Sequence, residues 1–188
     1  MESIKKIVGI LESLKIDYML LGGWALPAYG NVRATVDVDI ALCPEIAINR
    51  SRLEKLRSEL KKKQVEIVTS DSSESPVFAW ADLENKVEGE FWFKPDGVPM
   101  KNEVLERRIR RRIGDVEVWV IGPEDFIVNA LARSDRGPSH DQDALSVLMK
   151  SSIDQSISLD MEYLERRAKS ADVSGLLRSL QRKLQTQP

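Results

Sequence analysis

The alternation of hydrophobic and polar positions in the first part of the chain predicts helices and strands in turn. Apolar residues recur every three or four positions in residues 2–15, which is the spacing of an amphipathic helix. Short apolar runs are typical of buried strands, and Pro44 interrupts the chain before a charged helical stretch. The expected elements are a helix over 2–15, a strand over Tyr18–Leu21, a helix over Ala25–Tyr29, a strand over Thr35–Leu42, a helix over Ile46–Lys63 and a strand over Gln64–Thr69.

The rest of the chain changes from mixed to helical patterning. Ser70–Ser75 is expected to be a polar loop, and Gln185–Pro188 a frayed end. The expected elements are strands over Val87–Phe93 and Val116–Ile121, a basic helix over Glu103–Arg112, and helices over Phe126–Ala132, Gln142–Lys150, Leu159–Lys169 and Ser174–Leu184. We therefore expect a core over 1–122 and a helical C-terminal region over 123–188 packed on it.

Composition narrows the class of protein. The chain has 188 residues, of which 42% are hydrophobic and 31% charged, and a net charge of −2 gives no global case for nucleic-acid binding. The one cysteine, Cys43, excludes an internal disulfide framework. No apolar run is long enough to span a membrane, and the first residues lack the pattern of a signal peptide. We expect a cytoplasmic protein with no membrane partner.

Two acids interrupt the second predicted strand. Side chains alternate along a strand, so Asp37 and Asp39 would share one face, with Cα atoms about 6.5–7 Å apart. Carboxylates at that spacing repel each other, and burying one without a partner is costly. A hard divalent cation such as Mg²⁺ removes the conflict, because it prefers oxygen ligands. The alternative is a strand whose outer face is simply in water.

The glycine pair upstream favours the metal interpretation. Gly22 and Gly23 follow a predicted strand and precede a predicted helix, where backbone amides can approach a phosphate closely. No Gly-Lys-Ser/Thr follows them, and the G-x-G-x-x-G fingerprint is absent. A glycine turn for phosphate beside an acid pair for metal predicts a site for a nucleoside triphosphate.

The string G-G-W-A-L-x-A-x-G-x-x-R-x-T-x-D-x-D-I resembles the signature of the DNA polymerase β-like nucleotidyltransferase superfamily. It also resembles the compact branch that contains AbiEii-type toxins, and antibiotic nucleotidyltransferases share much of it. "VEVWVIGPEDFI", "HDQDALSVL" and "LDMEYLERRA" extend the resemblance downstream. The resemblance implies an α/β (α+β) nucleotidyltransferase fold, in which helices flank a mixed twisted sheet and the C-terminal part is helical.

The resemblance also implies the chemistry. A nucleotide would move from an NTP to a hydroxyl acceptor with release of pyrophosphate. Asp37 and Asp39 would hold two Mg²⁺ ions, or Mn²⁺, and a third carboxylate would complete the site. Glu90 is the preferred third carboxylate and could accept the proton of the acceptor. Glu88 is the alternative, and Glu66 ranks third.

Contacts to the nucleotide are implied in the same way. Gly22, Gly23 and the Trp24 amide would cradle the triphosphate. Arg33 would neutralise phosphate charge, or else form an ordinary surface salt bridge. Thr35 would support the loop.

Two positions depart from the toxin-like pattern. Members of that branch often carry a lysine in the helix after Pro-Glu-Asp, where this chain has Ala130, and Arg133 could take its place. They also have an acidic motif before the next helix, for which Asp141 is preferred to Asp143. The missing lysine favours an alternative in which the protein binds nucleotide but does not catalyse transfer.

The acceptor is left open between tRNA, protein and a small molecule of the antibiotic type. The arginine cluster, which comprises Arg107, Arg108, Arg110, Arg111 and Arg112, could contact RNA phosphates or form a solvated face. A toxin-like role would add a cognate antitoxin as partner. His140 has no companion histidine or cysteine and so predicts no zinc site.

Overall fold

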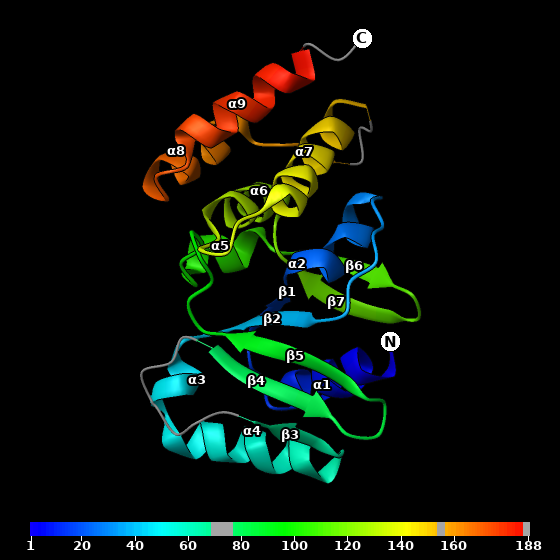
Figure 1. The fold of residues 1–188 in the computed structure, drawn as a ribbon. Coiled ribbons are helices and arrows are strands. Elements are labelled where there is room, and N and C mark those ends of the chain that lie inside the picture. The colour runs from blue at the N-terminus through cyan, green and yellow to red at the C-terminus, as the bar shows by residue number, and fades with distance from the viewer. Residues whose placement is uncertain (69–76, 154–156, 186–188) are drawn as a thin grey trace.

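The computed structural model describes residues 1–68, 77–153 and 157–185. The expected loop over Ser70–Ser75 and the last three residues of the chain lie outside these ranges. Within them the chain forms a mixed seven-stranded sheet with the order β3-β4-β5-β2-β1-β7-β6, flanked by helices (Figure 1). The predicted fold class is therefore confirmed.

The strands at the centre of the sheet are the apolar runs of the sequence, and both faces of the sheet are covered there. β1 and β2 pair antiparallel at the centre, and their apolar side chains are almost fully buried. β1 also pairs parallel with β7, and β2 pairs parallel with β5. The strands are β1 (Tyr18–Leu20), β2 (Val38–Leu42), β3 (Val65–Ile67), β4 (Val77–Asp82), β5 (Val87–Trp92), β6 (Ile109–Ile113) and β7 (Val116–Val120).

The helices lie on either side of this sheet. In Figure 1, α1 lies behind the sheet, and α6 to α9 gather at the top of the view. The helices are α1 (Glu2–Ser13), α2 (Gly22–Ala25), the 3-10 helix η1 (Leu26–Tyr29), α3 (Glu45–Ile48), α4 (Arg50–Lys62), α5 (Asn102–Arg107), α6 (Pro123–Ala132), α7 (Pro138–Ile153), α8 (Met161–Ser170) and α9 (Ser174–Gln185). No helix within the described ranges is both long and apolar enough to cross a bilayer.

Several local predictions differ from the structure. The helix expected over Ile46–Lys63 is divided at Asn49 into α3 and α4, and Gly22 and Gly23, expected to precede a helix, form the start of the short helix α2. The segment Glu103–Arg112 is not one helix, because β6 pairs with β7 and turns its second half into a strand. β4 was not predicted, although it pairs along its length with β5. β2 begins at Val38 rather than Thr35, so Asp37 lies in the preceding loop. The prediction that Asp37 and Asp39 share one face of a strand is therefore wrong, because only Asp39 belongs to the strand.

Charged groups also join distant elements. Arg167 on α8 donates from Nε to Asp125 Oδ1 on α6 at 2.9 Å and from Nη2 to the Gly97 carbonyl at 2.8 Å. Tyr163 donates its hydroxyl to the other carboxylate oxygen of Asp125 at 2.7 Å. Since Asp125 is fully buried, this network compensates a charge that would otherwise destabilise the fold.

Asp82 closes the turn after β4 in a comparable way. Its side chain is buried, which alone would raise its pKa, but hydrogen bonds from Asn85 and Lys6 outweigh burial and lower the pKa to about 2. The carboxylate is therefore ionised in the folded protein at neutral pH.

Candidate functional site

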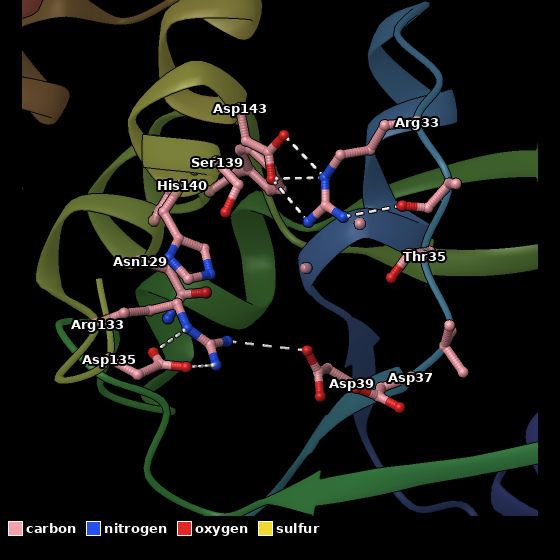
Figure 2. A pocket seen from close by; sticks show the side chains of 16 residues that line it. Arg33, Thr35, Asp37, Asp39, Asn129, Arg133, Asp135, Ser139, His140 and Asp143 are labelled. Carbon is pink, nitrogen blue, oxygen red and sulfur yellow. Dashed lines mark hydrogen bonds and ion pairs between the residues drawn. The ribbon is translucent and has the colours of Figure 1, made fainter. Parts of the chain in front are cut away.

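The glycine turn and the acid segment meet at a cavity of about 390 Å³, shown in Figure 2. Gly22 has φ +57°, and a Cβ atom there would lie 2.7 Å from Asp39 Oδ2. A Cβ atom on Gly23 would lie 2.8 Å from Cβ of Thr35. Only glycine therefore allows the turn to lie so close to the acid segment. Thr35 packs against the turn, whereas the Trp24 side chain is not part of the cavity wall.

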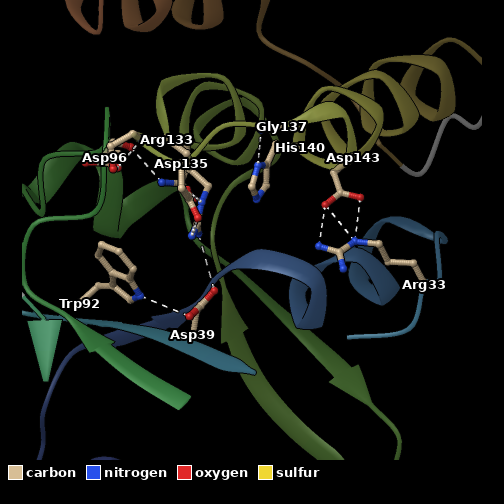
Figure 3. A network of polar contacts seen from close by, with 11 residues as sticks. Arg33, Asp39, Trp92, Asp96, Arg133, Asp135, Gly137, His140 and Asp143 are labelled. Atoms are coloured by element: carbon tan, nitrogen blue, oxygen red, sulfur yellow. Dashed lines mark hydrogen bonds and ion pairs between the residues drawn. The ribbon is translucent and has the colours of Figure 1, made fainter. Parts of the chain in front are cut away.

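Asp39 is the partly buried carboxylate at the centre of the site. Its Oδ1 accepts a hydrogen bond from Trp92 Nε1 at 3.3 Å, and its Oδ2 lies 3.8 Å from Arg133 Nη1 (Figure 3). Burial raises the pKa of Asp39 above its ordinary value, and the nearby Asp37 and Asp135 add to this, although Trp92 and Arg133 oppose it. Asp37 is exposed and lines the same cavity.

Glu90 lies beside Asp39 because β2 and β5 pair in parallel, with these two residues as Cα partners. Burial raises the pKa of Glu90, and the negative charge of Asp39 raises it further. Glu90 and Glu88 line a second cavity, of about 640 Å³, which Asp37 and Asp39 also border. Glu66 on β3 is exposed and lines neither cavity.

These carboxylates suit a hard divalent cation. In the described part of the chain no three His, Cys, Asp or Glu side chains form a ready-made metal cage. Asp37, Asp39 and Glu90 nevertheless border one cavity together with, among the described residues, a single guanidinium group, that of Arg133. Carboxylate oxygens are the ligands that Mg²⁺ prefers, so Asp37, Asp39 and Glu90 are the residues that would hold such an ion.

Arg133 enters the cavity from the end of α6. Its Nε donates to Asp135 Oδ1 at 2.7 Å and its Nη2 to Asp135 Oδ2 at 3.0 Å. Its guanidinium carbon lies 5.7 Å from the centre of the Trp92 ring. Ala130, at the position of the expected lysine, lines the same cavity. Arg133 thus provides a cation near the place where the lysine is absent.

Arg33 and Asp143 form the opposite wall. Nε of Arg33 lies 3.0 Å from both carboxylate oxygens of Asp143, and Nη1 donates to the Ala34 carbonyl. Asp141, the acid preferred from sequence, instead pairs with Arg136 at 2.7 Å and is not part of the cavity wall. Asp143 rather than Asp141 lines the cavity, because both acids lie in the first turns of α7, which begins at Pro138, and they point to different sides of that helix.

Four polar residues in the cavity wall were not predicted as site residues. They are Asn129 on α6, Asp135 between α6 and α7, and Ser139 and His140 in the first turn of α7. From the sequence, His140 predicts neither a zinc site nor a place in the nucleotide site. The preceding Gly-Pro pair indicates that His140 lies near the start of a helix. The direction in which its ring points depends on how α7 packs, which the sequence does not indicate.

The arginine cluster is largely engaged in ion pairs on or beside the edge strand β6. Arg107 pairs with Asp160 at 2.8 Å, and Arg108 pairs with Asp17 at 2.7 Å. Arg110 pairs with Glu12 at 3.0 Å. β6 is separated from β2 by β7 and β1. The cluster therefore contributes to the fold and lies apart from the two cavities.

Comparison of the whole structure finds proteins of the same fold. The solution structure of the antibiotic-resistance factor ANT(2'')-Ia is 16% identical, with a TM-score of 0.57 over 97% of this chain and 92% of the other. A lincomycin-bound lincosamide antibiotic adenylyltransferase, LnuA, is 13% identical, with a TM-score of 0.54 over 78% and 95%. An antigenic nucleotidyltransferase-like protein from Paracoccidioides brasiliensis is 19% identical, with a TM-score of 0.50 over 90% of each chain.

Sequence comparison supplies the family. A search of curated proteins finds no significant match. The model of the family described as "Nucleotidyl transferase of unknown function (DUF2204)" matches residues 1–184. That match spans nearly the whole chain and agrees with the fold and with the paired glycine turn and acid segment, so the protein belongs to this nucleotidyltransferase family.

Proposed function

We propose that the protein transfers a nucleotide from an NTP to a hydroxyl group of a small molecule, with Mg²⁺ bound by Asp37, Asp39 and Glu90. The observation that carries this proposal is the meeting of the two cavities at Asp37 and Asp39. One cavity is bordered by the glycine turn and suits the nucleotide. The other is bordered by Glu90 and is large enough for an acceptor.

The reaction forms a bond between the acceptor oxygen and the α-phosphorus. The bond from the α-phosphorus to the bridging oxygen of the β-phosphate breaks, and pyrophosphate leaves. Mg²⁺ bound at the carboxylates would stabilise the negative charge of the attacking and leaving oxygens. Glu90 would accept the hydroxyl proton, since it borders the second cavity beside Asp39. Gly22 and Gly23 present backbone amides to the phosphates.

Two observations favour a small molecule over RNA as acceptor. Three members of the arginine cluster, on or beside the edge strand β6, already pair with acids of this chain. The related fold of ANT(2'')-Ia has also been crystallised with adenylyl-2''-tobramycin, at 14% identity and a TM-score of 0.57 over 91% of this chain and 96% of that one. A toxin-like role with an antitoxin partner stays a prediction that rests on the sequence resemblance alone.

The test is a labelling experiment. The protein is incubated with α-³²P-labelled NTPs, Mg²⁺ and separated cellular fractions of small metabolites, RNA and protein. We expect label in the metabolite fraction, and none with EDTA or with Asp39→Asn. Asp141→Asn is the matched control, because Asp141 is a nearby aspartate outside the cavity wall. Label in RNA or protein alone would contradict the choice of acceptor, and absence of both label and NTP binding would contradict the enzyme.

A further inference from the structure

The chain contains a single histidine, and it lies in the cavity assigned to the nucleotide. His140 belongs to the first turn of α7, and its half-buried ring points toward the space between Arg133 and Arg33 (Figure 2). The proposed transfer reaction assigns no role to this side chain.

Hydrogen bonds determine which ring nitrogen carries the proton. The Gly137 N–H donates to Nδ1 of His140 at 3.0 Å (Figure 3), and the His140 N–H donates to the Gly137 carbonyl at 3.0 Å. A ring nitrogen that accepts a hydrogen bond carries no proton, so the neutral ring holds its proton on Nε2. The backbone therefore orients the imidazole and leaves Nε2–H as its donor.

That donor is available to a ligand. Among the described residues, no protein acceptor is hydrogen-bonded to Nε2, whereas both guanidinium groups of the cavity are engaged. Arg33 is held by Asp143 and Arg133 by Asp135, each at hydrogen-bond distance. His140 thus offers a donor that can bind a ligand without first breaking an ion pair.

The charges of the cavity indicate what this ligand would be. Four carboxylates line it, those of Asp37, Asp39, Asp135 and Asp143, against two guanidinium groups. A polyphosphate needs favourable contacts on the wall opposite the carboxylates that bind the metal ion. Ala130 supplies none there, so the donors of that wall come from the segment between α6 and α7 and from the start of α7.

We propose that His140 donates a hydrogen bond from Nε2 to a β- or γ-phosphate oxygen of the bound NTP. Arg133 supplies a guanidinium group to the same cavity. This inference rests on the proposed function, because it assigns a contact within the same nucleotide site. Gly137 is a positioning residue in this arrangement, since its N–H selects the tautomer.

Two substitutions of His140 separate the ring's two roles. In His140→Asn, the side-chain oxygen can still accept from the Gly137 N–H, but the donor that reaches the cavity is lost. In His140→Gln, the amide nitrogen can occupy the place of Nε2. Calorimetry would measure binding of each NTP and of the matching monophosphate with Mg²⁺. We expect His140→Asn to weaken NTP binding about ten-fold or more, the loss of one hydrogen bond to a charged group. Monophosphate binding should be unchanged, and His140→Gln should stay within about three-fold of wild type.

The unmodified protein provides a second readout. Because the chain has one histidine, its imidazole gives a single set of ¹H–¹⁵N correlations. We expect the pattern of the tautomer protonated at Nε2, and a shift of that resonance on addition of NTP but not of monophosphate. This measurement holds even if a variant fails to fold.

The outcomes separate the two proposals. If wild type binds and transfers the nucleotide while His140→Asn binds NTP equally well, the role of His140 is refuted and the proposed function stands. An equal loss for NTP and monophosphate, or a resonance protonated at Nδ1, also refutes it. If wild type binds no NTP, both proposals fail.

Discussion

Arg33 and Asp143 provide a test of how the loop carrying Asp37 is held. The loop from 31 to 37 has no regular secondary structure, and the bidentate pair between these residues ties it to α7 (Figure 2). The Asp143 side chain is 8% exposed and the Arg33 side chain 37%. Removing Arg33 therefore leaves a buried carboxylate unpaired, whereas removing Asp143 leaves a guanidinium that can turn into water.

This asymmetry sets the expected magnitudes. Breaking a fully buried pair costs about 3–5 kcal/mol, whereas an exposed pair contributes roughly 0.2–1 kcal/mol. Arg33→Ala leaves the buried Asp143 carboxylate without its partner and should therefore lower the free energy of unfolding by about 2–3 kcal/mol. Asp143→Ala should lower it by about 1–2 kcal/mol, and the coupling energy from the double variant should be about 1–2 kcal/mol.

Urea unfolding of the wild type, the two single variants and the double variant measures these free energies of unfolding and the coupling energy. Calorimetry with NTP and Mg²⁺ then asks what the pair does for the site. We expect both single variants to weaken NTP binding by a similar factor, because each releases the same loop. A coupling energy below about 0.5 kcal/mol would refute the anchoring role. A much larger binding loss for Arg33→Ala than for Asp143→Ala would instead identify Arg33 as a direct phosphate contact.

Three further perturbations follow from the structure. Gly22→Ala should lower the free energy of unfolding by about 1–2 kcal/mol through its positive φ, and should weaken NTP binding because the new Cβ displaces the Asp39 carboxylate. Arg167→Met should cost about 3–5 kcal/mol in urea unfolding, because it leaves the fully buried Asp125 without a cation. Asp82 has a folded-state pKa of about 2, below its ordinary 3.8, so the stability that it contributes is complete above about pH 4 and is lost as the pH falls toward 2. Asp82→Asn should abolish this dependence on pH, which amounts to about 2 kcal/mol in the free energy of unfolding.

Matched variants control for general damage. Gly9→Ala, in an open position on α1, should leave stability unchanged or improved, unlike Gly22→Ala. Arg166→Met removes an exposed pair with Glu103 and should cost less than about 1 kcal/mol. Glu84→Gln is the control for Asp82→Asn, because Glu84 is an exposed acid that also pairs with Lys6. Equal effects in a variant and its control would contradict the physical reason given for that prediction.

Features that depend on near neighbours in the chain could be predicted from the sequence. The glycine turn, the acid segment and most helices are encoded in local spacing, because backbone conformation and amphipathic periodicity are determined within a few residues. The sequence placed Gly22 and Asp39 on neighbouring strands, and the antiparallel pairing of β1 with β2 brings them together across the connection over residues 21–37. The mixed fold class followed from the order of these elements.

Only the tertiary structure decided the features that depend on distant partners. The arginine-rich segment became β6 because β7 supplies its hydrogen bonds. Glu90 lies beside Asp39 through the register of β2 and β5, which no local pattern encodes. Asp143 rather than Asp141 faces the cavity, and His140 points into it, because the packing of α7 sets which side of its first turn faces the loop of Arg33. Strand pairing and buried ion pairs are chosen by the whole fold, since their energies depend on burial and on partners far away in the chain.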